Sequence, residues 1–191
     1  ALTTVEFELG SQLTTIDTFA FKECDALTEI KIPKSVTTIG TFAFQSCKAL
    51  TTVIFEDGSK LETIGEGAFQ ECIALTEIKI PKSVIGIGDN AFQSCKALTT
   101  VIFEERSQLN AIVEDAFKGC ENLTTITAQS DIHGLLEKHK QTNTNIYNNP
   151  DTNGTQKSVG SQITGGGKKS RNIRKRSRKS GGMRPIVPSI K

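Results

Sequence analysis

The stretch ALTEIKIPKSV stands at residues 26–36 and again at residues 74–84, and the stretch AFQSCKALTTVIFE stands at residues 43–56 and again at residues 91–104. The offset between the two copies is the same for both stretches. Identity over segments of this length at one fixed offset indicates the duplication of a 48-residue unit. A fixed internal period is the signature of a repeat architecture, so the fold has to be built from units stacked on one another.

Each 48-residue unit contains two coils, a 23-residue and a 25-residue one. One cysteine recurs in every coil, and a phenylalanine and an L-x-x-[IV]-x-[IFA] motif follow the same alternating rhythm. The longer coils differ at a polar turn, where residues 33–35 become residues 56–60, and insertions in surface turns cost little. The recurring residues are Cys24, Cys47, Cys72, Cys95 and Cys120; Phe21, Phe44, Phe69, Phe92 and Phe117; and Leu2, Leu27, Leu50, Leu75, Leu98 and Leu123.

Each L-x-x-[IV]-x-[IFA] motif predicts a short strand. In the copy at residues 27–32, the apolar side chains of Ile30 and Ile32 alternate with polar ones, which is typical of a half-buried strand. A single coil cannot bury its own apolar face, but stacked coils align equivalent side chains into columns and pair their strands about 4.8 Å apart. We therefore expect a stacked array with a column of phenylalanine rings in its core.

A turn residue follows the second apolar run of each coil. It is Gly40, Gly65 or Gly88 in three coils, and we expect a tight corner with positive φ at these glycines. Asp17 takes the same place in the first coil. Val113 takes it in the fifth coil and fits this expectation poorly.

The combined pattern L-T-x-[IV]-x-[IF]-P-x-S-V-x-x-I-G-x-x-A-F-x-x-C extends through residues 2–128 and resembles the BspA-like family of leucine-rich repeats. The resemblance implies an α/β-type leucine-rich-repeat solenoid, rich in β structure, with five to six right-handed coils of alternating length and a parallel sheet on one face. It also implies a non-catalytic module for protein–protein interaction or adhesion. We assign residues 1–128 to this solenoid.

The five cysteines in one column are open to three interpretations. Buried free thiols that pack as small apolar groups are favoured, because equivalent side chains point in parallel and their number is odd. A disulfide between adjacent coils is the second interpretation. A metal site is the third, although residues 1–128 contain no histidine that could join it. Free thiols mildly favour a reducing compartment.

The strand side chains that alternate with the core residues define a candidate partner-binding face. Ile54 and Ile102 are apolar where the pattern leads us to expect polar residues. One interpretation is β-propensity on a tolerant surface. The other is a strip that contacts a protein partner, because a repeat array presents one continuous surface. The residues of this face are Glu29, Lys31, Thr52, Ile54, Glu77, Lys79, Thr100 and Ile102, followed by Thr125 and Thr127.

Phe19 and Phe42 precede the core phenylalanine of the first two coils, where later coils have glycine, asparagine or aspartate. We expect their rings to stack on adjacent coils at the convex side, either as a small interaction patch or partly covered by the turns of their own coils. At the first coil, Val5 and Phe7 have no coil above them. The sequence therefore predicts either a truncated array or a partner at that end.

Beyond residue 128 the composition changes. Residues 129–140 are predicted to form a capping helix, with Ser130 as the N-cap and apolar residues on one face. Residues 141–191 are poor in apolar side chains that could offset the entropy of ordering, so they are predicted to be disordered. The apolar residues of the helix are Ile132, Leu135 and Leu136.

Charge divides the chain at the same point. Residues 1–128 carry 18 acidic and 10 basic side chains, net −8, whereas residues 129–191 carry 3 acidic and 13 basic ones, net +10. The basic segment at residues 168–179 is open to three interpretations: a solvated tail, a nuclear localisation signal, or contact with nucleic acid or an anionic surface. It contains no aromatic residue for base stacking. Its basic residues are Lys168, Lys169, Arg171, Arg174, Lys175, Arg176, Arg178 and Lys179.

The remaining features limit the classes of function. No apolar run approaches the roughly 20 residues of a membrane-spanning helix. No catalytic arrangement and no phosphate-binding glycine pattern is present, so we expect no enzyme activity and no cofactor. The favoured function is binding of a protein partner through the strand face. The alternative is a nuclear or nucleic-acid-associated protein whose residues 168–179 do the binding. The compartment is left open, with an intracellular site, including the nucleus, favoured over a secreted or cell-surface one.

Overall fold

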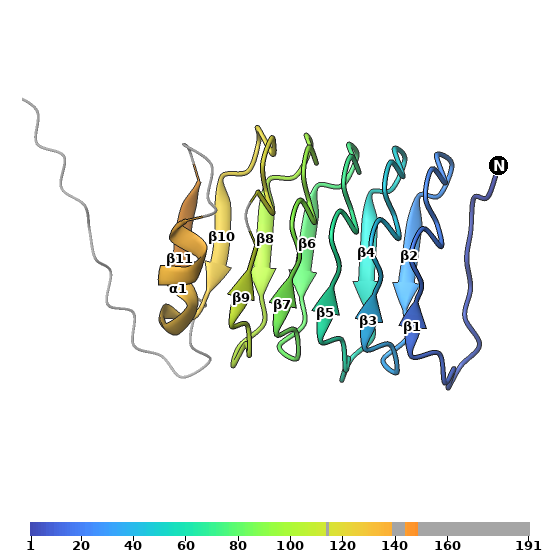
Figure 1. The fold of residues 1–191 in the computed structure, drawn as a ribbon, viewed down its shortest axis with the longest axis horizontal. Helices are drawn as coiled ribbons and strands as arrows, with labels where there is room; N and C mark the ends of the chain where they lie inside the picture. Colours follow the sequence, from blue (N-terminus) through green and yellow to red (C-terminus); the bar gives the residue numbers. More distant parts are fainter. Residues whose placement is uncertain (114, 139–143, 149–191) are drawn as a thin grey trace, which may run out of the picture. The chain divides into compact units, whose positions relative to one another are not determined.

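The structure is a computed structural model that describes residues 1–113, 115–138 and 144–148. Its coils stack along one direction, so that each strand lies beside the equivalent strand of the next coil (Figure 1). The strands of neighbouring coils are parallel, and one short helix follows the last complete coil. The predicted solenoid fold is therefore confirmed.

The wide sheet is formed by the L-x-x-[IV]-x-[IFA] motifs. Its register pairs core residue with core residue, as in Ile30 with Val53 and Ile78 with Val101. Within the described residues the hydrogen-bonded ladder has two parts, β2–β4 and β6–β8–β10–β11, and this break between β4 and β6 is not predicted by the repeat. The strands are β2 (Glu29–Ile32), β4 (Thr52–Phe55), β6 (Glu77–Ile80), β8 (Thr100–Phe103), β10 (Thr125–Ala128) and β11 (Asn145–Asn148).

A second, narrow sheet lies along another side of the stack, and the sequence pattern did not predict it. Each coil contributes two residues, the second of which is a buried isoleucine. Because stacking brings the same short apolar run of every coil into register, even two-residue segments form a continuous parallel ladder. The strands are β1 (Thr15–Ile16), β3 (Thr38–Ile39), β5 (Thr63–Ile64), β7 (Gly86–Ile87) and β9 (Ala111–Ile112).

The core consists of columns of equivalent side chains between the two sheets. The phenylalanine column that the sequence predicts is present: from Phe21 to Phe117, neighbouring rings are stacked with centroids 5.1 to 5.4 Å apart. Burying each such ring contributes on the order of 2–3 kcal/mol. Phe21 at the end of the column is half-buried, whereas the other four rings and most of the leucines and isoleucines beside them are buried.

The expectation of positive φ at Gly40, Gly65 and Gly88 is wrong, because none of these glycines adopts it. They are needed for close approach instead: a Cβ atom on Gly65 would lie 2.8 Å from the carbonyl carbon of Gly40 in the previous coil. Left-handed residues lie instead two and six positions after this corner in every coil. They are Phe19, Phe42, Gly67, Asn90 and Asp115, and Glu23, Ser46, Glu71, Ser94 and Gly119.

The C-terminal end of the array contains helix α1 (Ser130–Glu137), which buries Ile132 and Leu136 in the core and so caps the last coil. The prediction of Ser130 as N-cap is wrong, because Gln129 holds that position without a side-chain capping bond. The Gln129 side chain instead accepts a hydrogen bond from the backbone N–H of Arg106, at 2.8 Å. No helix in the described part of the chain is long and apolar enough to cross a membrane.

Strand β11 pairs with β10 in parallel, in the register Ile126 to Ile146. The ordered array thus extends past residue 141, where the sequence predicted that disorder begins. The reason is that β10 offers an open edge, and even a polar segment can pair with such an edge through its backbone. The other predictions for residues 141–191, including the basic segment, lie outside the described residues.

Candidate protein-binding face

The outward side chains of the wide sheet lie where the alternation predicts them. In β2 and β6 the burial pattern is strictly exposed, buried, exposed, buried. The register sets Glu29 beside Thr52 and Lys31 beside Ile54, and the next pair of coils repeats this arrangement. Ile54 is 40% exposed. The structure therefore brings the eight predicted residues onto one side of the molecule.

Two glutamates that sequence reasoning missed hold the lysines of this face in place. Lys31 Nζ lies 3.3 Å from Glu56 Oε1, and Lys79 Nζ lies 3.0 Å from Glu104 Oε1. The other oxygen of Glu56 accepts a hydrogen bond from the backbone N–H of Lys34, at 3.1 Å, and Glu104 has the same contact with Lys82. The available signal was a glutamate directly after each Thr-Val-Ile-Phe strand, in the coil that follows the lysine.

These contacts also shift the ionisation of both glutamates. The pKa of Glu56 is lowered, first by the hydrogen bond from the Lys34 backbone and then by Lys31. Burial acts to raise the pKa of Glu104, but the hydrogen bonds from Lys79 and Lys82 outweigh it, so this pKa is lowered as well. Both glutamates are therefore ionised at neutral pH, and they pair with the lysines that lie beside Ile54, which is exposed, and Ile102, which is half-buried.

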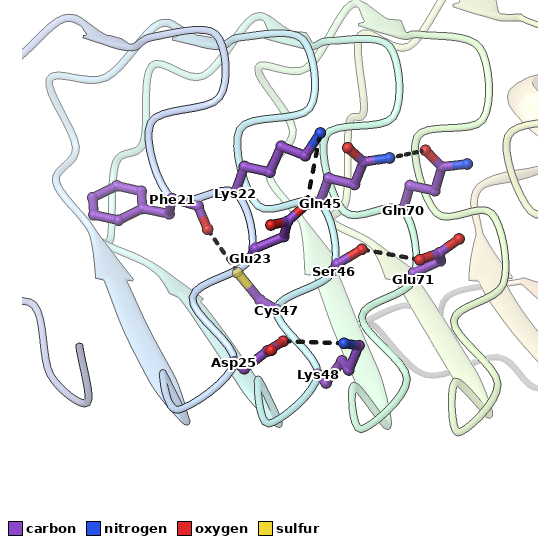
Figure 2. Close-up of polar contacts among 10 residues, drawn as sticks. All are labelled: Phe21, Lys22, Glu23, Asp25, Gln45, Ser46, Cys47, Lys48, Gln70 and Glu71. Atoms are coloured by element: carbon purple, nitrogen blue, oxygen red, sulfur yellow. Dashed lines mark hydrogen bonds and ion pairs between the residues drawn. The ribbon is translucent and has the colours of Figure 1, made fainter. Parts of the chain in front are cut away.

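The turns on another side of the stack carry side chains that bond to one another from coil to coil (Figure 2). Gln45 donates to Gln70 at 2.7 Å, and Gln70 donates in turn to Gln93. Ser46 Oγ donates to Glu71 at 2.9 Å. Because these side chains hydrogen-bond to one another along the stack, they stabilise the contacts between coils. The amide groups of Gln45, Gln70 and Gln93 are thus used within the chain.

Phe19 and Phe42 stack on this side with their ring centroids 5.6 Å apart. Phe19 is 51% exposed and Phe42 is half-buried, because the Phe42 ring fills the space that a side chain at Gly67 would need. Lys22 Nζ lies 5.2 Å from the Phe19 ring centroid. Phe19 is thus exposed, and Phe42 is covered by the next coil at Gly67 and not, as the second expectation had it, by the turns of its own coil.

The five cysteines form one column without a disulfide, as the first interpretation predicts, and four of them are buried. All five cysteines are free, and Cys24 at the end of the column is only half-buried. Each of the other four donates its Sγ–H to the carbonyl oxygen of a phenylalanine in an earlier coil, at 3.0 to 3.2 Å. Burial raises the pKa of Cys47 to about 12, and it raises the pKa of Cys72 as well. The pKa of Cys95 is raised first by its hydrogen bond with Cys120 and then by burial. These thiols are therefore unreactive at neutral pH.

Residues 1–14 form no strand beside β2. Val5 and Phe7 are half-buried against the core, and an open hollow between this segment and β2 is lined by Glu29, Lys31 and Glu56. Within the described residues, no group of three or more acidic, histidine or cysteine side chains could hold a metal ion.

Six copies of a family model described as "BspA type Leucine rich repeat region" match the chain over residues 2–124 and 39–148. No curated protein matches it. Among solved structures, the leucine-rich repeat protein TpLRR of T. pallidum is 32% identical, with a TM-score of 0.57, and the match covers 62% of this chain and 54% of that one.

Two further solved structures are similar. A leucine-rich cell surface protein from Faecalibacterium prausnitzii is 36% identical, with a TM-score of 0.57 and coverage of 63% of this chain and 31% of that one. The pneumococcal vaccine antigen PcpA is 28% identical, with a TM-score of 0.56 and coverage of 71% and 32%. The chain therefore spans about half the length of TpLRR and about a third of the other two.

Proposed function

Because this chain belongs to the BspA-type leucine-rich repeat family, we propose that it is a non-catalytic module that binds a protein partner, or adheres to one, through the outward face of its wide sheet. Proteins of this family are generally protein-interaction or adhesion modules. A stack of coils presents its outward side chains as one continuous surface, and this is how repeat proteins usually bind.

The observation that carries the proposal is the exposure of Ile54 between charged neighbours. Ile54 is 40% exposed on the sheet, and the equivalent residue of the duplicated unit, Ile102, is half-buried there. Lysines held by glutamates flank both positions. An apolar centre within a polar rim is the usual anatomy of a protein interface. Two of the similar structures are named as a cell surface protein and a vaccine antigen, which supports the adhesion form of the proposal.

The test replaces both isoleucines of the face, as Ile54→Asp with Ile102→Asp. The tagged full chain is expressed in its own cell, and co-purifying proteins are quantified by mass spectrometry. A matched control is Ile73→Asp with Ile85→Asp, because these isoleucines are 43% and 37% exposed but lie outside the wide sheet. We expect a partner that the first variant loses by about tenfold or more and that the control retains. Equal recovery with both variants would refute the proposal.

A second candidate function rests on the charge of the sequence. Eight basic residues in the twelve of segment 168–179 are suited to binding phosphates of nucleic acid or an anionic surface. Such binding weakens steeply with salt, because each neutralised phosphate releases a counterion. Titration of duplex DNA and of RNA at several salt concentrations, with the full chain and with a variant lacking residues 168–179, tests it. The candidate fails if the deletion leaves the affinity and the salt dependence unchanged.

A further inference from the structure

The wide sheet face carries two columns of opposite character, which lie two residues apart on β2, β4, β6, β8 and β10. Both point away from the core, because strand side chains alternate between the two sides. Over the first four coils of each column, a charged residue alternates with threonine or isoleucine, and the fifth coil has threonine in both columns. The acidic column is Glu29, Thr52, Glu77, Thr100 and Thr125, and the basic column is Lys31, Ile54, Lys79, Ile102 and Thr127.

The charges of these columns are not fully matched within the chain. Glu29 and Glu77 form no ion pair with any residue that the structure describes. Lys31 and Lys79 each have one glutamate neighbour, yet 61% of each side chain remains exposed. An occupant of the face must therefore place cations over the two glutamates and anions over the two lysines, at a spacing of two coils, or about 10 Å.

A second copy of the same chain supplies this pattern. Consider a two-fold axis that runs parallel to the stacking direction, above the face and midway between the two columns. Rotation about this axis places a second copy face to face with the first, with its strands antiparallel to those of the first copy. Each coil then faces the equivalent coil, and the acidic column of one copy lies on the basic column of the other. Glu29 faces Lys31 of the second copy and Glu77 faces Lys79 of the second copy, and both contacts occur twice.

The other two-fold arrangement of the two faces is less favourable. With the axis parallel to the strands, each column lies on itself in reverse order. Side chains of the same charge then face each other across the contact, as Glu29 of one copy and Glu77 of the second copy. In other registers the charged side chains face threonine or isoleucine. Only the axis along the stack pairs opposite charges at every charged position.

We propose that the wide sheet face is the contact between two copies of this chain, related by a two-fold axis that follows the stack. The inference rests on the proposed function, because it names the partner of the same face. A contact in which residue i meets residue j and residue j meets residue i is the isologous kind that most homodimers use. Face-to-face packing of two sheets with nearly aligned strands is likewise a common arrangement.

The size and chemistry of the face set the strength of the contact. Four-residue strands are about 13 Å long and five of them side by side extend for about 20 Å, so the area is small for a protein interface. Its exposed ion pairs are screened by salt. The dimer is therefore weak and reversible, and it dissociates as the salt concentration rises.

Sedimentation velocity of the full chain over a dilution series, at low and high salt, measures the dimer. The variant Glu29→Lys with Glu77→Lys sets lysine against lysine at all four charged contacts, and we expect its association constant to fall by about tenfold or more. Adding Lys31→Glu and Lys79→Glu restores the original net charge and the opposite-charge contacts. Because the swap also sets glutamate beside Glu56 and Glu104 within each copy, it should recover a part of the lost association and not all of it.

A control separates the contact from net charge alone. Glu62→Lys with Glu66→Lys changes the net charge by the same amount at two exposed glutamates that lie off the wide sheet, and it should leave the dimer intact. Circular dichroism confirms that each variant is folded. A loss of dimer in this control equal to the loss in the Glu29→Lys, Glu77→Lys variant would overturn the proposal.

Cross-linking tests the register directly. In the proposed arrangement, position 52 of one copy lies opposite position 54 of the second copy. In a background with Cys24→Ser, a short bis-maleimide should link an equal mixture of the Thr52→Cys and Ile54→Cys variants more efficiently than either variant alone. The remaining native thiols are buried, and the Cys24→Ser chain alone serves as the control for any reaction at them. Equal cross-linking in the mixture and in the single variants would contradict the proposed axis.

The dimer and the proposed function can fail separately. A chain that stays monomeric at every concentration refutes the dimer. If the variant Ile54→Asp with Ile102→Asp still loses a partner in that case, the face binds another protein and the proposed function stands. If the four-residue swap recovers a part of the lost association, the second copy is a partner of the face.

Discussion

At the scale of single residues, the corner of each coil depends on how closely two backbones approach. Gly65 has no side chain because the backbone of the previous coil occupies the space that a Cβ atom would need. Just after this corner, the ring of Phe42 lies over Gly67. Phe42 adopts φ of 54°, a left-handed conformation that costs roughly 1–2 kcal/mol for a residue with a side chain. Its stacking with Phe19 offsets part of this cost.

We predict that Gly65→Ala lowers the free energy of unfolding by about 2–4 kcal/mol, because the new methyl group must push two coils apart. The matched control is Gly86→Ala, since a Cβ atom at Gly86 meets nothing within 4 Å. This control should change the stability by less than about 1 kcal/mol. Urea denaturation followed by circular dichroism measures both, and equal effects would contradict the close-approach explanation.

The cysteine column makes stability depend on alkaline pH. Burial raises the pKa of Cys47 to about 12, from an ordinary value of 9.0. Below pH 9 the thiol is protonated in both the folded and the unfolded chain, so its contribution to stability is fully present. Between pH 9 and about 12 only the unfolded chain loses this proton, so the folded state loses stability as the pH rises.

We predict that the free energy of unfolding falls above pH 9 by about 1.4 kcal/mol per pH unit for each thiol that ionises only on unfolding. Urea titrations at pH 7.5 and pH 10.5 measure the difference. Cys47→Ala should show a smaller fall than the wild type over this interval, because it lacks one such thiol. A fall of the same size in both proteins would show that Cys47 is not responsible.

At the scale of elements, identical segments take different environments. Residues 43–56 and 91–104 have the same sequence, yet Val53 is 8% exposed and Phe55 is half-buried, whereas Val101 and Phe103 are fully buried. The difference lies in their neighbours. Strand β8 is paired on both sides, with β6 and β10, whereas β4 is paired only with β2.

We predict that Phe103→Ala costs about 3–5 kcal/mol of stability and that Phe55→Ala costs less by at least about 1 kcal/mol, because it removes a ring that is already partly in water. The two substitutions are matched, since both phenylalanines stand in the same place of the repeated AFQSCKALTTVIFE stretch. Denaturant unfolding of the two variants gives the comparison. A larger loss for Phe55→Ala would mean that the break between β4 and β6 does not loosen β4.

At the scale of the whole molecule, the 48-residue unit repeats both the strand register and the turn lengths. Each coil contacts only its neighbours, so stability is approximately a sum over coils and their interfaces. A whole unit can therefore be removed without disturbing the coils that remain. Removing residues 54–101 joins Val53 to Ile102 and recreates the sequence Leu-Thr-Thr-Val-Ile-Phe-Glu without a scar.

We predict that the chain without residues 54–101 folds cooperatively and keeps its β-type circular dichroism, with a lower melting temperature because two coil interfaces are lost. Removing residues 54–100 instead leaves one extra valine in the strand. This one-residue slip turns core side chains outward and outward ones inward, so this variant should not unfold cooperatively. Thermal unfolding of both variants measures the effect, and equally cooperative unfolding would contradict the role of strand register.

The sequence by itself determined the repeat, the strand positions, the buried columns and which strand residues point outward, because alternation and period are local properties that any stack of coils must obey. It also predicted that α1 caps the end of the array, since an apolar helix face needs a core to cover. The capping role of Ser130 was not predictable in the same way, because the position of a helix end depends on where Gln129 finds its partner.

Only the tertiary structure decided the features that depend on contacts between coils. The narrow sheet exists because stacking aligns two-residue runs that are too short to be recognised alone. Glycine is required at the corners because the backbone of the previous coil lies too close for a Cβ atom. The glutamate partners of Lys31 and Lys79 come from the next coil along the chain. The break between β4 and β6, which gives two identical segments different exposure, is likewise a property of neighbours. A coil's own residues determine its shape, but the coil beside it determines which atoms are close.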